Sequence, residues 1–288
     1  MSRRTFAKRH TGARVADLAG KTLLSLAAAV TVAVLLALLF YVLAKGLPHL
    51  SWDFLTQMPR RMGRQGGIYP TIIGTIYLAG VALALAAPVG VAAAVYLAEY
   101  ARPSRFTRLL RFGTETLAGV PSVIFGLFGF VAFVILLKLG WSVLSGGLTL
   151  ALMILPTVIR TSEEAIRAVP RSYREGSLAL GATKWQTTWR VVLPSALPGI
   201  LTGLLLGLGR AVGETAAVLL TAGSSLGVPV SPLDPARTMS IHLYILAVEG
   251  ISLERAYATA AVLILTILAL NLFATGVVRR LTPKGGTM

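Results

Sequence analysis

The chain has 288 residues, of which 55% are hydrophobic and only 13% are charged, and it contains no cysteine. A soluble domain of this size could not bury so much apolar surface, so the composition predicts a protein whose solvent is largely lipid. The absence of cysteine excludes disulfides, iron–sulfur clusters and thiolate zinc sites, and the three histidines show no metal-ligand spacing.

The formal net charge of +16 would suggest nucleic-acid binding in a soluble protein. Here the basic residues flank apolar runs, and the arginine-rich stretches are not interleaved with aromatic residues. We therefore expect membrane lipid, and no nucleic acid, as their partner. The apolar run after the basic N-terminus is too long for a signal peptide and lacks a clear cleavage site, so we expect it to remain as a membrane helix.

Six apolar runs are long enough to cross a bilayer, which takes about 20 residues. They predict an all-α integral membrane protein with spans at roughly 22–43, 70–97, 117–137, 141–159, 197–220 and 256–278. The predicted organisation is a tail at 1–21, a first membrane helix at 22–43, a loop at 44–69, a core membrane domain at 70–220 that contains a polar segment at 160–194, a loop at 221–255, a last membrane helix at 256–278 and a tail at 279–288.

Lysine and arginine predict the orientation of these spans. Nineteen of them lie in the two tails and in the stretches after the second and fourth spans, against seven in the other connections. The positive-inside rule therefore places both termini and the 160–194 segment in the cytoplasm, and the 44–69 and 221–255 loops outside.

The polar segment after the fourth span carries helix signals. Thr161–Glu164 and Ser172–Glu175 both have capping-box spacing, and Pro170 separates the two. Gly181 is suited to end the second short helix, and Thr183 to begin a third. The pattern predicts a helix–turn–helix elbow, although composition alone is equally consistent with an amphipathic loop lying on the lipid surface.

The spacing within this elbow resembles a motif of known membrane proteins. Glu175, Gly181 six residues later and the Leu193-Pro194 pair match the EAA loop of ABC importer membrane subunits, with glycine and serine in place of the two alanines. In that family the loop forms a coupling helix that docks on a separate ATPase subunit. The resemblance assigns ATPase coupling to the following residues: Glu175, Gly176, Ser177, Leu178, Ala179, Leu180, Gly181, Leu193 and Pro194.

Longer runs extend the resemblance to nearly the whole chain. The stretches 66–75, 118–129, 160–187 and 209–223 are similar to the PstA-type permeases of phosphate importers. The resemblance implies the MetI-like fold of type I ABC importers, with six transmembrane helices, and ATP-driven inward transport of phosphate. It also implies a bacterial inner-membrane location and three partners: a PstC-type permease subunit, a PstB-type ATPase dimer and a PstS-type phosphate-binding protein.

Other functions find less support in the sequence. A PstC-type sister subunit, or the permease of another oxyanion importer, is the main alternative because it shares the Gly-Arg-Ala-x-Gly-Glu-Thr core at 209–215. An ion-coupled carrier should show repeated halves with broken helices, which are not visible. The Gly20-Lys21-Thr22 stretch resembles the end of a phosphate-binding P-loop, but the first glycine that this motif requires is absent. We therefore expect a non-catalytic subunit that binds no cofactor itself, with ATP held by the partner ATPase.

Arg210 and Glu214 lie within the predicted fifth span. A charge at the bilayer centre costs about 2.5–3.5 kcal/mol, whereas an i, i+4 pair on one helix returns only about 0.2–0.5 kcal/mol. We therefore expect both to face the bundle interior or an aqueous path. Either Arg210 supplies positive potential for phosphate and Glu214 positions it or limits phosphate binding, or the two form a structural pair that locks this helix to a neighbour in the partner subunit.

Two further features carry structural predictions. Gly199, Gly203 and Gly207 recur every four residues, which predicts a face for close helix packing. The stretch 238–246 is apolar enough for a short helix in the external loop. That helix either meets the external binding protein or rests on the membrane surface.

Overall fold

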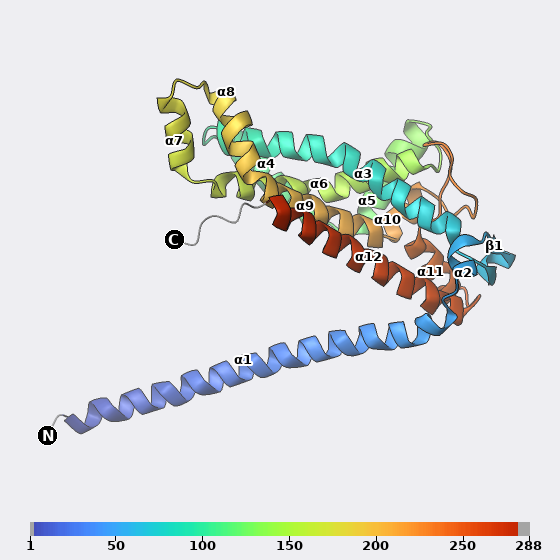
Figure 1. Cartoon of the computed structure of the whole chain (residues 1–288), viewed down its shortest axis with the longest axis horizontal. Coiled ribbons are helices and arrows are strands. Elements are labelled where there is room, and N and C mark those ends of the chain that lie inside the picture. Colours follow the sequence, from blue (N-terminus) through green and yellow to red (C-terminus); the bar gives the residue numbers. More distant parts are fainter. Residues whose placement is uncertain (1–2, 282–288) are drawn as a thin grey trace.

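The computed structural model describes residues 3–281, and the side chains of residues 16–276 and 278. Of the predicted tail at 279–288, residues 282–288 lie outside this described part. The long helices α3, α6, α9 and α12 form a bundle with short elements at both ends, and α1 splays away from it (Figure 1). The helices and strands are α1 Arg3–Gly46, α2 Trp52–Thr56, β1 Pro59–Arg60, β2 Gln65–Gly66, α3 Tyr69–Val95, α4 Arg105–Ala118, α5 Ser122–Gly129, α6 Val143–Ala168, α7 Arg171–Ala179, α8 Lys184–Thr187, α9 Leu193–Gly213, α10 Ala216–Thr221, α11 Met239–Val248 and α12 Leu253–Leu281. Short 3₁₀ turns lie at Leu47–His49 and Arg61–Gly63, and π-helical segments at Tyr96–Tyr100, Phe130–Leu136 and Thr188–Val192.

The helix α6 is the centre of the bundle. It packs against α3 on one side and α9 on another, and α5 and α10 also contact it. Leu78, Ala82, Leu150 and Ile154 are almost fully buried in the core between α3 and α6. The apolar side chains that point away from this core are exposed along α1, α5 and α12, as expected for helices that face lipid or another subunit.

The two ends of the bundle differ. The start of α1, the last turns of α12, and the pair α7 and α8 all lie toward the left of Figure 1, which we call the elbow end. The β1–β2 hairpin, α2 and α11 lie at the opposite end, which we call the loop end.

Five helices are long and apolar enough to cross a membrane, at Ala16–His49, Tyr69–Tyr100, Val143–Ala168, Lys184–Gly213 and Leu253–Gly276. The predicted third span, 117–137, corresponds to α5 and its π-helical continuation, which run together from Ser122 to Leu136, and α4 meets this helix at a bend of 103°. Pro121 lies at this bend; its ring restricts the preceding residue and removes a helical N–H. The predicted start of the first helix, at residue 22, also differs. The helix α1 runs continuously from Arg3, because the basic stretch before residue 22 contains good helix formers.

Both predicted capping boxes are wrong. The helix α6 continues to Ala168, so Thr161 lies inside it, and its hydroxyl donates to the Thr157 carbonyl at 2.7 Å. The helix α7 follows directly from Pro170 without a side-chain cap. In contrast, the cap predicted at Thr183 is confirmed, and Gln186 completes a capping box there. The helix α6 continues past Thr161 because it buries Ser162 and Ile166, and this burial outweighs the local capping spacing.

The predicted glycine face of α9 is confirmed as a packing face. A Cβ added at Gly199 would lie 2.5 Å from the Ala165 methyl group, and one at Gly203 would overlap the Thr161 hydroxyl. A Cβ at Gly209, on the same helix, would meet nothing within 4 Å. Close approach of α6 and α9 therefore depends on Gly203 and not on Gly209.

The variants G203A and G209A test this contact with the same chemical change on one helix. We expect G203A to lower the thermal stability of the purified protein, because overpacking a close contact costs roughly 1–3 kcal/mol. We expect G209A to be neutral or slightly stabilising, because alanine is favoured over glycine in helices by about 1 kcal/mol. Equal melting temperatures for the two variants in detergent would contradict this packing.

Candidate functional site

The elbow is a rigid, locally encoded turn. Pro170 separates α6 from α7, and Gly181, with φ of +84°, reverses the chain after α7 in a conformation that favours glycine. The side chains of Ser177 and Thr187 are joined by a hydrogen bond of 2.9 Å, which ties α7 to α8. The chain then continues through a π-helical segment directly into α9.

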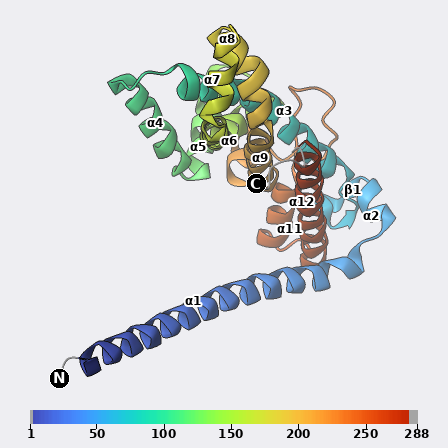
Figure 2. The same ribbon diagram turned by 60° about the vertical axis from the view of Figure 1, so that its left-hand side comes forward.

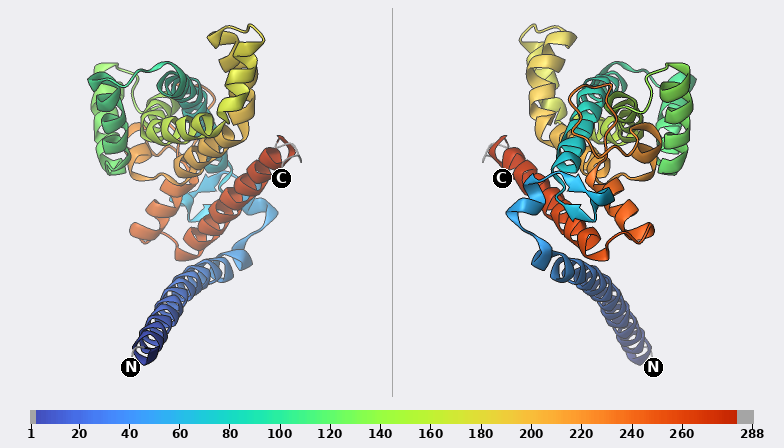
Figure 3. Two further views of the ribbon diagram at one scale, coloured as in Figure 1. Left: turned by 90° about the vertical axis from the view of Figure 1, so that its left-hand side faces the viewer. Right: turned by 90° about the vertical axis from the view of Figure 1, so that its right-hand side faces the viewer.

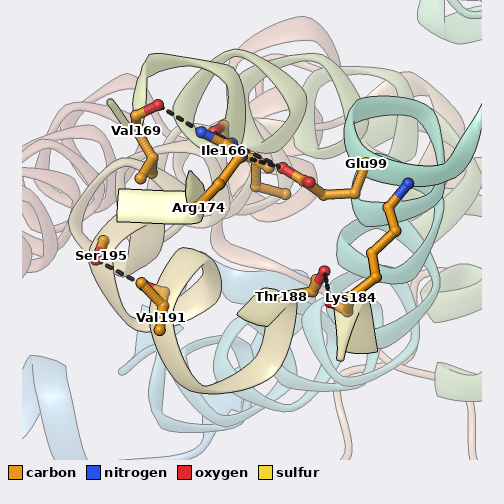
Figure 4. Close-up of polar contacts among 8 residues, drawn as sticks. All are labelled: Glu99, Ile166, Val169, Arg174, Lys184, Thr188, Val191 and Ser195. Atoms are coloured by element: carbon orange, nitrogen blue, oxygen red, sulfur yellow. Dashed lines mark hydrogen bonds and ion pairs between the residues drawn. The ribbon is translucent and has the colours of Figure 1, made fainter. Parts of the chain in front are cut away.

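Arg174 fastens this elbow to the bundle. Its Nε and Nη2 atoms donate to Glu99 Oε1 at 3.0 and 2.7 Å, Nη1 donates to the Val169 carbonyl at 2.6 Å, and Nη2 also donates to the Ile166 carbonyl at 2.8 Å (Figure 4). The side chains of Arg174 and Glu99 are only 20% and 10% exposed. Charge-assisted hydrogen bonds sheltered from water are the strong class, so α7 is held tightly to both α3 and the end of α6.

Glu99 supplies this anchor from the end of α3. It lies in the π-helical segment Tyr96–Tyr100, and the ammonium group of Lys184 at the start of α8 sits 4.9 Å from the centre of the Tyr100 ring. One turn of backbone therefore contacts both arms of the elbow (Figure 4). The sequence analysis missed Glu99, which is 75 residues from Arg174; its only local signal is a carboxylate at the end of an apolar helix.

The predicted coupling residues divide into two groups. Glu175, Gly176, Leu178, Ala179, Leu180 and Gly181 are exposed at the tip of the elbow, and Ser177 is half-buried against Thr187. Leu180 is 92% exposed, and Leu178 on the same elbow is 49% exposed. Leu193 instead packs beside the buried cluster of Ile166 and Val192 at the start of α9, while Pro194 is exposed.

The predicted fifth span, 197–220, carries both Arg210 and Glu214 on one helix, but the structure separates them. The helix α9 ends at Gly213, and Glu214 is extended, with φ of −71° and ψ of 135°. Its carboxylate accepts from the Ala217 amide at 3.3 Å at the start of α10. Arg210 is exposed, and within the described part of the chain it makes no ion pair. The glycine at 213, a weak helix former, precedes this break.

A buried loop holds the break between α9 and α10. The Ser240 hydroxyl donates to the Glu214 carbonyl at 2.6 Å, and the Met239 amide donates to the Thr75 hydroxyl of α3 at 2.9 Å. The predicted helix at 238–246 forms as α11, capped by Thr238. Its first turn is buried, however, rather than resting on a surface.

Comparison with known proteins assigns this architecture. Residues 86–285 match the family described as "Binding-protein-dependent transport system inner membrane component". The chain belongs to this family. The membrane components of this family are non-catalytic permease subunits of ABC transporters, so the predicted non-enzymatic role is confirmed.

Named relatives cover most of this permease. The phosphate transport system permease protein PstA of Haemophilus influenzae is 36% identical over 82% of this chain and 84% of its own length. The probable ABC transporter permease protein YqgI of Bacillus subtilis is 34% identical over 91% of this chain and 94% of its own length. A PstA 1 protein of Mycobacterium tuberculosis (strain H37Rv) is 34% identical over 73% of this chain and 68% of its own length.

Solved structures confirm the predicted MetI-like permease fold. A chain of the inward-facing MetNI methionine ABC transporter matches with a TM-score of 0.64 at 18% identity, over 75% of this chain and 96% of that one. A chain of a bacterial alginate importer matches with a TM-score of 0.63 at 18% identity, over 84% and 88%. At such identities the likeness shows the fold alone.

The variant R174Q tests the anchor of the elbow. We expect hydrogen exchange of the α7 amides to rise by roughly 10- to 100-fold, because each lost hydrogen bond to a charged group is worth about 1.5–3 kcal/mol. R171Q removes an exposed arginine from the same helix and serves as the control. If R174Q and R171Q exchange at the same rate, the contacts of Arg174 do not order the elbow.

Proposed function

We propose that this permease subunit forms half of a phosphate pathway across the bacterial inner membrane, with transport directed inward and driven by ATP. The exposed, rigidly anchored elbow is the observation that carries the proposal. Several large apolar side chains, Leu178, Leu180 and Trp185, are exposed on this elbow, and exposed apolar surface of more than one residue marks interaction sites. The residues at 175–181 would dock on a separate ATPase subunit that binds the ATP, which leaves this chain without a cofactor.

The contacts of the elbow supply a route for coupling. A movement of the docked α7 would pull on α3 through Glu99 and on α6 through the carbonyl groups that Arg174 binds. The same movement would reach α9 through the continuous helical chain from α8. Closure of the ATPase would therefore reorient three long helices together.

Phosphate is proposed as the substrate because relatives at 34–36% identity are named phosphate permeases. Arg210 is exposed in the last turn of α9, and an unpaired arginine facing lipid would be costly. We place it instead at the pathway between this subunit and a PstC-type partner, since guanidinium groups match phosphate oxygens. Glu214 would keep its predicted influence on Arg210 only indirectly, by fixing the break after α9.

The rest of the proposed complex follows the family. A PstB-type ATPase dimer would meet the elbow, and a PstS-type binding protein would deliver phosphate at the loop end. Both termini and the elbow would be cytoplasmic, in line with the lysine and arginine distribution. A PstC-type role in the same complex is one alternative, and transport of another oxyanion is a second, which the assay below separates.

Uptake of labelled phosphate into vesicles that carry the full complex and internal ATP tests the proposal. We expect R210Q to reduce uptake by roughly 10- to 100-fold, the size of one or two charge-assisted hydrogen bonds, while the complex still assembles. K21Q, which removes an exposed cation from α1, is the control and should transport normally.

Each other result has a defined meaning. Loss of assembly in R210Q would favour the structural interpretation, in which Arg210 locks α9 to the partner subunit. Normal assembly with normal uptake would reject both interpretations of Arg210. Uptake of labelled sulfate in preference to phosphate would show that the permease serves another oxyanion.

A further inference from the structure

The helix α4 lies across the bundle instead of along it. It makes an angle of 103° with α5, which together with its π-helical continuation leads back toward the loop end. Figure 2 shows α4 at the side of the molecule, and in Figure 3 it lies at the outer edge of the bundle.

One edge of α4 fixes it to the elbow end. Thr107 is buried, and its hydroxyl donates to the Arg102 carbonyl at 2.9 Å. Arg111 pairs with Glu163 of α6 at 3.0 Å and also donates to the Leu97 carbonyl of α3 at 3.4 Å. These contacts place α4 at the level where α3 ends and the elbow begins.

A second face of α4 is apolar and unpartnered. Phe106, Leu109 and Leu110 have the i, i+3, i+4 spacing of one helix face, and Leu117 extends it. Phe106 and Leu109 are 61% and 63% exposed. The face continues into an apolar groove of about 410 Å³ between α4, α5 and α6, whose lining includes Leu117, Ile124, Phe128, Leu152 and Ile159.

The remaining exposed face of α4 carries two arginines, with Phe112, which is 65% exposed, between them. Arg105 and Arg108 are exposed, and no ion pair involves either within the described residues. They border a concave surface of about 540 Å³, lined also by Ser104 and Arg111, at the start of the helix. An interfacial helix combines exposed apolar and basic side chains in this way.

We infer that α4 is an interfacial helix that binds anionic phospholipid of the leaflet at the elbow end. The apolar face of Phe106 and Leu109 lies among the upper acyl chains, and Arg105 and Arg108 contact headgroup phosphates. The charge complementarity favours anionic over zwitterionic lipid, and the groove beside Leu117 accommodates an acyl chain. Naming this leaflet as the cytoplasmic one rests on the orientation in the proposed function.

Spin labels can test the placement of α4, because the chain has no cysteine and single-cysteine variants carry a label at one site. The full complex, with cysteine-free partner subunits, is placed in nanodiscs that contain phosphatidylglycerol. We expect a label at L109C to be relaxed by oxygen and not by a water-soluble nickel complex, and a label at R108C to show the reverse. L268C, on an exposed part of α12, reports lipid contact as the control.

Two results would overturn the inference. Relaxation of the L109C label by the nickel complex would place this face in water. Protection from both reagents would show that a partner subunit covers it. Neither result depends on which substrate is transported, so a failure of phosphate uptake leaves this test intact.

The headgroup contact has its own test. When Arg105 and Arg108 are intact, replacing phosphatidylglycerol with phosphatidylcholine should reduce oxygen access at L109C, because the helix lifts away from the membrane. R105Q/R108Q should abolish this response, whereas R60Q/R61Q, a matched pair at the loop end, should retain it. A response that survives R105Q/R108Q would overturn the contact with anionic headgroups.

Discussion

Arg174 makes four hydrogen bonds that join three separate parts of the chain. Its guanidinium group satisfies the Glu99 carboxylate, which is 10% exposed, and two carbonyl groups at the end of α6. The partial negative charge at a helix C-terminus favours a cation there. The removal of Arg174 would leave a sheltered carboxylate without its partner, so the direction of the elbow depends on this residue.

The elbow end and the loop end therefore differ in how their helices are held. At the elbow end, π-helical segments flank the contacts of Arg174 and Lys184, at Tyr96–Tyr100 and at Thr188–Val192. Such segments often occur at functional sites in helices. At the loop end, Ser240 fixes the break after α9 through a buried hydrogen bond. Movement that starts at the elbow would therefore tilt α9 toward or away from a comparatively fixed break, and Arg210 lies one turn before that break.

The sequence predicted the features that depend on local chemistry. Apolar length found α3 and α12, the Thr183 cap and the left-handed Gly181 were readable from their residue types, and the four-residue glycine spacing predicted the packing face of α9. The family resemblance predicted the fold. Each of these signals lies within a few residues, where backbone preference or helix periodicity decides the outcome.

Features that depend on distant contacts were missed. The bend between α4 and α5 follows from Pro121 together with the pairing of Arg111 and Glu163, which are far apart in sequence. The break at Glu214 is completed by Ser240 from the first turn of α11. Thr161 has a capping-box spacing but lies inside α6, because burial of the next turns outweighs a local cap. Hydropathy alone cannot distinguish a helix that crosses a membrane from one that lies along its surface.

Cross-linking of the elbow tip in a working complex is the most direct test of its proposed docking. A photoactivated cross-linker on a single cysteine at Ala179 or Leu180 is applied while the complex hydrolyses ATP. We expect the label to capture the ATPase subunit, with a yield that changes between the nucleotide-free and ATP-bound states. Cross-links to lipid alone, during active transport, would contradict the proposal that an ATPase holds this elbow.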